Sequence, residues 1–342
     1  MPPPNTAATR DILSLLQKIA RVGAEPTDIL ARAKVPCTLE DLESGRIAQI
    51  DRRHLVAIYR ECIVTIGWHS SRLDRKPQMH PDEFRLMCHC VITSRTFRQA
   101  IERQAMFFGT RHERVSTVEL AVDGPTATIF VDTLRRLKDF SAFLSDLAGM
   151  SMFCRFYGWL IGIGAHPFRV GLAYGPGYAN EAVSDFFAGE LTFGCPVNSI
   201  SFPAHLLDLP VVRTPEVLEQ LLVDFPFDFL SAAPDTISLP DRVRTLYAIA
   251  LTRDSSLPTL EQLAGLTGHS VSSLRRRLAD EQVSIRELKE SAQKGVAIEA
   301  LKQRRQSIDE IAFRAGFRDT NSFRIAFKRW TGTTPSAFRS GG

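Results

Sequence analysis

Apolar side chains recur every three or four residues along much of the first 107 residues, which is the spacing of one helix face. This spacing predicts helices over about residues 9–22, over a short segment that follows Pro26, over 52–66, and over 82–107 with a turn near 93–94. The first part of the chain is therefore expected to be mainly helical.

The pattern then changes to one typical of β-strands. Residues 115–122 and 127–131 are rich in β-branched side chains and flank Asp123-Gly124, so we expect a β-hairpin there. Residues 168–174 and 200–203 are further candidates for short strands. Together with the helices, these strands predict an α+β fold for the N-terminal part.

A long apolar segment, residues 140–162, lies between the expected hairpin and the later strands and is predicted to be a helix. Extended to residue 165, it is long enough to cross a bilayer. Asp146 and Arg155 would then lie in the hydrocarbon, where charged side chains are costly. We therefore expect a helix that is buried in the protein or in a dimer interface, and no membrane partner.

An internal repeat occupies the C-terminal part of the chain. Residues 260–269 match residues 308–317 at an offset of 48, and residues 270–275 match residues 319–324 at an offset of 49. A segment that occurs twice in one chain predicts two copies of the same small structural unit.

Each copy has the order of a helix–turn–helix motif. A first helix with one apolar face is followed by Gly268 or Gly316, which suits a tight turn with positive φ. Ser270 or Asp319 then suits the N-cap of a second helix. The predicted motifs span about residues 260–281 and about residues 308–331.

The second helix of each copy is expected to bury its apolar residues and to expose short polar side chains and arginines. Such side chains suit the edges of bases in a DNA major groove. The alternative is a pair of helical hairpins with arginines on a solvated face, but two copies in a basic region favour DNA binding. The residues expected to contact DNA are Ser272, Ser273, Arg275, Arg276, Asn321, Ser322, Arg324 and Lys328.

Charge separates the two parts of the chain. Residues 242–342 carry 18 Lys or Arg and 10 Asp or Glu, a net charge of +8, whereas residues 1–241 carry 24 and 28, a net charge of −4. A basic end on a mildly acidic body is typical of nucleic-acid binding. Residues 285–302 predict one helix of about 27 Å between the copies, which would hold the second helices about one DNA turn, near 34 Å, apart.

Residues 242–339 resemble the DNA-binding domain of the AraC/XylS transcriptional regulators. The matching positions are Ile308, Ile311, Ala312, Ala315, Gly316, Phe317, Ser322, Phe323, Phe327, Lys328, Arg329, Gly332, Pro335, Phe338 and Arg339. The resemblance implies an activator more often than a repressor, with promoter DNA and RNA polymerase as partners. The family usually has Arg at the position of Ile325 and Gly at that of Gln282, and here the arginine stands one residue earlier, at Arg324.

The N-terminal part resembles the ligand-sensing and dimerisation domain of the arabinose-binding-like branch of that family, most clearly over residues 193–210. The resemblance implies an unknown small-molecule effector, a homodimer and no catalytic residues. We therefore expect a sensor domain over residues 10–225, a linker over 226–241 with several prolines, and an all-α DNA-binding domain over 242–340 with two helix–turn–helix motifs joined by a long helix.

The cysteines indicate a reducing compartment. All six lie in the first 195 residues, and no export signal precedes them, so we expect reduced thiols in a cytoplasmic protein. Cys88-His89-Cys90 resembles part of a metal site, but on a helix residues two apart point in different directions. We therefore expect Cys88 and Cys90 to pack a core rather than to bind a metal, and their redox role stays open.

Two other functions stay open at this point. The N-terminal part could be an enzyme-like domain fused to a DNA-binding domain, which a deep pocket with a nucleophile beside a perturbed titratable group would favour. It could also serve only for dimerisation in a constitutive regulator. A closed, mostly apolar pocket without such a pair would favour the sensor.

Overall fold

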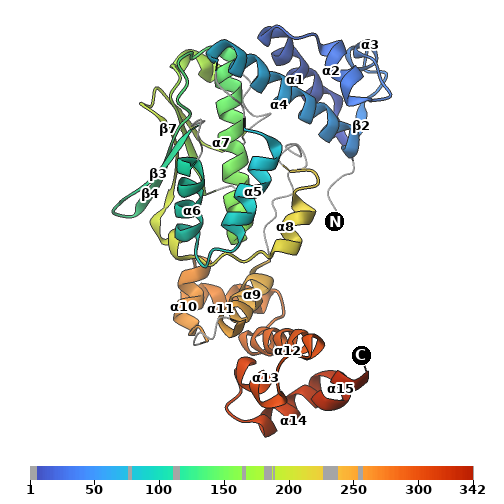
Figure 1. Cartoon of the computed structure of the whole chain (residues 1–342), viewed down its shortest axis with the longest axis vertical. Coiled ribbons are helices and arrows are strands. Elements are labelled where there is room, and N and C mark those ends of the chain that lie inside the picture. Colours follow the sequence, from blue (N-terminus) through green and yellow to red (C-terminus); the bar gives the residue numbers. More distant parts are fainter. Residues whose placement is uncertain are drawn as a thin grey trace. The chain divides into compact units, whose positions relative to one another are not determined.

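The computed structural model describes residues 6–75, 79–110, 116–163, 167–180, 187, 189–225, 238–252 and 257–341. Backbone contacts divide the chain into two units, Met1–Thr236 and Ile237–Gly342, and each is described by itself (Figure 1). The division falls inside the expected linker, of which residues 226–237 lie outside the described residues, as does residue 115 of the first expected strand. Helix α9 (Leu239–Thr252) begins before the expected end of the linker.

Eight α-helices are described in the first unit. The predicted helices over 9–22, after Pro26 and over 82–107 are confirmed, and the one over 52–66 extends to Asp74. Short helices over 39–43 and 215–221 were not predicted, because each is too short to show a helical period. The helices are α1 (Thr9–Val22), α2 (Pro26–Ala33), α3 (Leu39–Glu43), α4 (Arg52–Asp74), α5 (Pro81–Ile92), α6 (Phe97–Thr110), α7 (Phe140–Ile161) and α8 (Pro215–Leu221).

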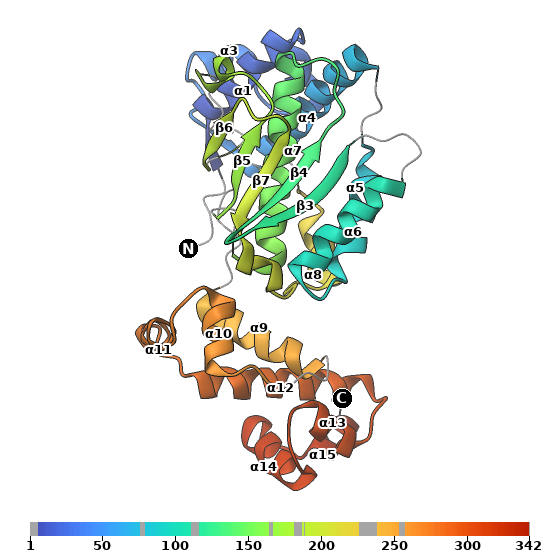
Figure 2. The ribbon, with the colours of Figure 1, turned by 90° about the vertical axis from the view of Figure 1, so that its left-hand side faces the viewer.

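The strands of the first unit form a five-stranded sheet in the order β3-β4-β7-β5-β6, with α7 behind it (Figure 2). All neighbours are antiparallel except β5 and β6, which are parallel. A separate pair, β1 (Thr6–Ala8) and β2 (Gln49–Asp51), lies outside this sheet. The strands of the sheet are β3 (Thr117–Asp123), β4 (Thr126–Asp132), β5 (Arg169–Leu172), β6 (Leu191–Phe193) and β7 (Asn198–Pro203).

The expected hairpin is present, but its turn lies one residue later than the sequence suggested. Asp123 still pairs with Thr126, so the two-residue loop is Gly124-Pro125. Gly124 has φ +52°, a conformation that glycine adopts without strain. The α+β prediction for the N-terminal part is confirmed.

Helix α7 is the centre of the first unit. It is buried on nearly all sides within its own chain, which confirms the expectation of a buried helix. Across the described ranges, no helix combines the length and the apolar character needed to cross a bilayer. The one carboxylate on α7, Asp146, is only 2% exposed and therefore needs partners inside the protein.

Four donors surround the Asp146 carboxylate. Its Oδ2 accepts hydrogen bonds from the hydroxyls of Thr133 (2.9 Å) and Tyr174 (2.8 Å) and from Asn198 Nδ2 (2.8 Å). Its Oδ1 accepts one from Arg135 Nε at 2.6 Å. Burial and the Asp146 charge raise the pKa of the Tyr174 hydroxyl, which therefore keeps the proton that it donates. The network ties α7 to β7 and to the segments that follow β4 and β5.

All the regular elements described in the second unit are helices, as predicted. Its central helix, α12, contributes Leu288, Ala292 and Val296 to one apolar core and Ala297, Ala300 and Leu301 to another. The first core is completed by α9–α11 and the second by α13–α15. The helices after α9 are α10 (Leu260–Thr267), α11 (Val271–Asp280), α12 (Ile285–Gln303), α13 (Ile308–Arg314), α14 (Thr320–Thr331) and α15 (Pro335–Gly341).

Turns and caps in this unit follow the sequence expectations. Gly268 and Gly316 have φ of +71° and +78°. Ser270 accepts a hydrogen bond from the backbone N–H of the third helical residue of α11, and Asp319 does the same for α14. Gln282, where the resembling family has glycine, also adopts a positive φ of +58°, so this departure changes the residue and not the backbone.

We expect the substitution Asp146→Ala to lower the free energy of unfolding by about 3–5 kcal/mol. The change leaves the Arg135 side chain, which is only 15% exposed, without its buried counter-charge. The control is Glu190→Ala, which removes an ion pair with Arg169 whose side chains are 66% and 70% exposed. That change should cost at most about 1 kcal/mol. Urea unfolding of the full chain measures both, and equal losses would contradict the role assigned to Asp146.

Candidate functional site

Helix α11 separates its residues into a buried and an exposed side. Leu274 and Leu278 are 0% and 1% exposed, and they fix the side that faces the core. Of the predicted DNA-contacting residues on this helix, Ser273 is half-buried, whereas Ser272, Arg275 and Arg276 are exposed.

Helix α14 repeats this arrangement in the second motif. Phe323 and Phe327 are both fully buried. The four predicted DNA-contacting residues on this helix are exposed, as a DNA contact requires; they are Asn321, Ser322, Arg324 and Lys328. Their contacts with DNA stay predictions, and the structure supplies the side from which such contacts could be made.

The direction of each side chain follows from helix geometry, because successive residues are about 100° apart around the axis. Ile325 comes two residues after the buried Phe323 and so points almost directly away from the core, with 64% of its surface exposed. Arg324 comes one residue after Phe323 and lies toward the edge of the exposed side. Arg276 and Arg275 are the repeat equivalents of Ile325 and Arg324.

The electrostatics of the first motif agree with an edge position for Arg275. A hydrogen bond from its own backbone, one from Thr259 and the nearby charge of Arg275 hold the pKa of Glu261 below its usual value. Glu261 belongs to α10, so the charge of Arg275 acts on the first helix of the motif. Arg276 was among the residues predicted to contact DNA, whereas its repeat equivalent Ile325 was not, although the repeat alignment places the two at the same position.

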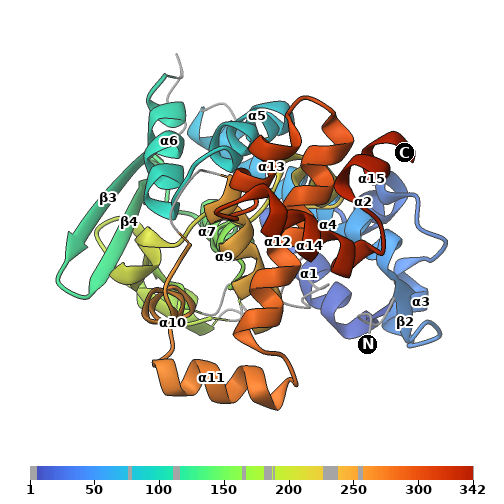
Figure 3. The same ribbon diagram turned by 90° about the horizontal axis from the view of Figure 1, so that it is seen from below.

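Three interactions fix the second motif to α12. Gln293, which is 6% exposed, donates a hydrogen bond to the carbonyl oxygen of Ala315 at 2.9 Å. Lys294 Nζ donates to the carbonyl oxygen of Trp330 at 3.0 Å. Arg329 pairs with Glu290 at 2.8 Å. Figure 3 shows α11 and α14 apart from one another and joined through α12.

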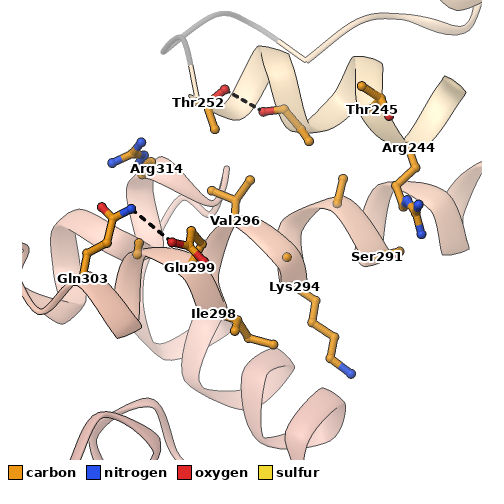
Figure 4. Close-up of a pocket in the computed structure, with 14 residues that line it drawn as sticks. Arg244, Thr245, Thr252, Ser291, Lys294, Val296, Ile298, Glu299, Gln303 and Arg314 are labelled. Carbon is orange, nitrogen blue, oxygen red and sulfur yellow. Dashed lines mark hydrogen bonds between the residues drawn. The ribbon is translucent and has the colours of Figure 1, made fainter. Parts of the chain in front are cut away.

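A groove of about 600 Å³ lies between α9 and α12, with Arg314 of α13 at one end (Figure 4). Several of its polar side chains make hydrogen bonds within the protein. Thr252 donates to the carbonyl oxygen of Ala248, Gln303 donates to Glu299, and Arg314 donates to Gln306. The groove therefore belongs to the packing of the second unit.

The first unit contains a smaller cavity of about 200 Å³ against α7. Apolar side chains such as Met150 and Phe153 line it together with the hydroxyls of Ser116 and Thr133. The Asp146–Arg135 pair forms part of its wall, but the carboxylate already accepts four hydrogen bonds. The volume lies below the 300–1,000 Å³ or so that holds a drug-sized ligand, so it suits a small molecule.

The cysteines take different places on α5. Cys88 is fully buried, and burial raises the pKa of its thiol, so it packs the core as expected. Cys90 is exposed, and the expectation that it packs a core is wrong because it lies on the solvent side of α5. Among the residues that the structure describes, no group of three or more His, Cys, Asp or Glu side chains is placed to hold a metal ion.

Two family models match the chain. The model described as the arabinose-binding domain of AraC transcription regulators, N-terminal, matches residues 23–211, which is more than half of the chain. The chain belongs to the AraC family of transcription regulators. A helix-turn-helix domain model matches residues 263–341, which include the second motif and all but the first three residues of the first motif of this AraC-family regulator.

Named relatives of this AraC-family regulator are also transcriptional regulators. It is 25% identical over 329 residues to the ornithine utilization regulator of Pseudomonas aeruginosa, covering 95% of this chain and 94% of that one. It is 32% identical to the regulator VqsM of the same organism over 143 residues, 41% and 43% of the two chains. The transcriptional regulator CdpR, also from Pseudomonas aeruginosa, matches in structure over 96% of this chain and 97% of that one, with 17% identity and a TM-score of 0.33.

We expect Arg275→Ala and Arg324→Ala to separate base contacts from phosphate contacts in this AraC-family regulator. If the arginine pairs with a guanine, its removal should cost about 1–3 kcal/mol of binding free energy and relax the preference at one or two base pairs. An arginine that contacts a phosphate should weaken binding to all sequences and reduce the salt slope by about one. Titration of each variant with matched duplexes at several salt concentrations distinguishes the two, and parental binding by both would refute either contact.

Proposed function

We propose that this AraC-family regulator is an effector-controlled activator that binds promoter DNA with both helix–turn–helix motifs. The observation that carries the proposal is the pair of exposed polar helix faces, on α11 and α14, that one helix holds in a single unit. The net charge of +8 over residues 242–342 supports it, because phosphates attract a basic surface. The proposed DNA contacts are the eight residues named from the sequence, with Ser273 at the edge of its face.

The proposal extends to the first unit, which would bind a small effector in the cavity beside α7 and mediate homodimer formation. The arabinose-binding family match supports a sensor role. Effector binding would shift the unit between states that present the DNA-binding unit differently to promoter half-sites and to RNA polymerase. A cytoplasmic location fits these partners.

An enzyme-like role for the first unit has less support. A catalytic carboxylate needs a free lone pair for a proton, and the Asp146 carboxylate in the cavity wall uses its acceptor sites on four protein donors. The proposal therefore assigns binding, and no reaction, to this cavity. A constitutive regulator that only dimerises is the outcome that an effector-independent response would indicate.

The salt dependence of DNA binding tests the first part of the proposal. If the two motifs contact 6–10 phosphates together, affinity should fall by about 10³–10⁵-fold between 50 and 200 mM salt. The measurement is a titration of the full chain with duplexes selected from a random library, and sedimentation of the same protein reports its dimer formation. Failure to select any sequence, or binding that is flat with salt, would contradict DNA recognition.

Filling the cavity tests the effector site. Gly149 lies on α7 at the cavity, and a Cβ built there meets no atom within 4 Å. Gly149→Leu should therefore occupy the cavity without a clash at Cβ and abolish the response of DNA binding to an effector. Gly149→Ala is the control and should keep the effector response. It adds only one methyl group to the cavity and favours the helix by up to about 1 kcal/mol.

A panel of small metabolites, including the ornithine in the relative's name, identifies the compound that alters DNA binding by the parent chain. The two variants are then compared with that compound. An unchanged response in Gly149→Leu would place the effector elsewhere, and a panel without any active compound would favour the constitutive regulator.

A further inference from the structure

An isoleucine occupies one of the outward positions of α14. Ile325 is 64% exposed and lies among Asn321, Arg324 and Lys328 on the exposed side of the helix. Single exposed apolar residues are common on protein surfaces and usually need no explanation. This one differs because it lies on the side of α14 that faces away from the core, and this helix is proposed to enter the major groove.

The two repeats differ at this position. Arg276 is the equivalent residue of α11, because the repeats match at an offset of 49 in these helices. Both residues follow their buried reference side chain, Leu274 or Phe323, by two positions, and both are exposed. Both helices begin with a side-chain N-cap, and the second turn is one residue longer, so the two helices present different chemistry from equivalent positions.

Isoleucine restricts what it can recognise. It has no hydrogen-bond donor or acceptor, so it gains nothing from phosphates or from the polar edges of bases. The C5-methyl group of thymine is the apolar group that bases display in the major groove. An arginine in the equivalent place has the opposite preference, because its two N–H groups match the O6 and N7 acceptors of guanine.

We propose that Ile325 is a specificity-determining residue that packs on a thymine methyl group in the half-site bound by α14, while Arg276 recognises guanine in the half-site bound by α11. The proposal rests on the proposed function, namely that both helices enter major grooves. Arg324 and Lys328 flank Ile325 on the same helix, and a contact of either with the DNA backbone would hold Ile325 against the base edge. The bound sequence is therefore different in its two halves.

Replacing thymine by uracil tests the contact, because this change removes the methyl group and leaves every hydrogen-bonding group in place. The full chain first selects its preferred duplex from a random library, and each thymine of that duplex is then replaced in turn. One replacement should weaken binding by the parent about fourfold, the factor expected when one buried methyl group is lost. The same replacement should leave binding by Ile325→Ala unchanged.

Two further variants make the test specific. Arg276→Ala should keep the full effect of that uracil and lose the guanine preference in the other half-site. Ile325→Arg should change the preferred base at the sensitive position from thymine to guanine in a repeated selection. Circular dichroism of each variant, together with its binding to unselected DNA at low salt, verifies that the fold is intact.

The outcomes separate this inference from the proposed function. Selection of a sequence in which no uracil weakens binding, or in which the uracil effect persists in Ile325→Ala, overturns the role of Ile325 and leaves DNA recognition standing. Failure to select any sequence overturns the proposed function itself.

Discussion

The second unit depends on α12, which contributes buried residues to both of its apolar cores. Each helix–turn–helix motif is short, and a segment of that size buries too little apolar surface to be stable alone. The N-terminal half of α12 completes the first core and its C-terminal half completes the second. The distance and the rotation between the two motifs are consequently set by a continuous helix rather than by a loop.

The turn of the second motif packs closely against α9 and α12. A Cβ at Gly316 would lie 2.8 Å from Leu251 Cδ2 of α9, so any other residue would require that side chain to shift. Gln293 reaches the neighbouring Ala315 carbonyl from α12. The glycine thus satisfies two demands, a positive φ and a close approach, whereas a Cβ at Gly268 in the first motif meets no atom within 4 Å.

In the first unit, a buried charge has the corresponding organising role. Asp146 gathers side chains from the end of β4, from β7 and from the segment after β5 onto one face of α7. A buried carboxylate is tolerated only when such donors are present, so the network fixes how the sheet meets the helix. The cavity lies against this junction, so an occupant would contact the groups that join the two layers.

The sequence predicts an element best where its apolar pattern repeats over several turns, and worst where the element is short and its partners are distant in the chain. Helices α1, α7 and α12 were found because each extends over three turns or more with a consistent apolar pattern. Strands β1, β2 and β6 are three residues long, too short for alternation to show, and their pairing joins segments far apart in the chain.

The sites show the same limit. Most of the exposed polar residues of α11 and α14 could be listed from the repeat alone, because local helix geometry decides which side is buried. The partners of Asp146 could not, since they are brought together by the sheet. At the sequence level Asp146 served only as an argument against a membrane helix, and its four donors gave no signal of their own.

The unlike residues at the outward position of the two motifs have a consequence for orientation. A pair of identical helices related by twofold symmetry suits a palindrome and binds equally well in both directions along a duplex. The two motifs of this chain are related by repetition within one polypeptide, and Arg276 and Ile325 make them chemically different. Such a pair is not symmetric, so the proposed contacts would be satisfied in only one of the two directions along a duplex.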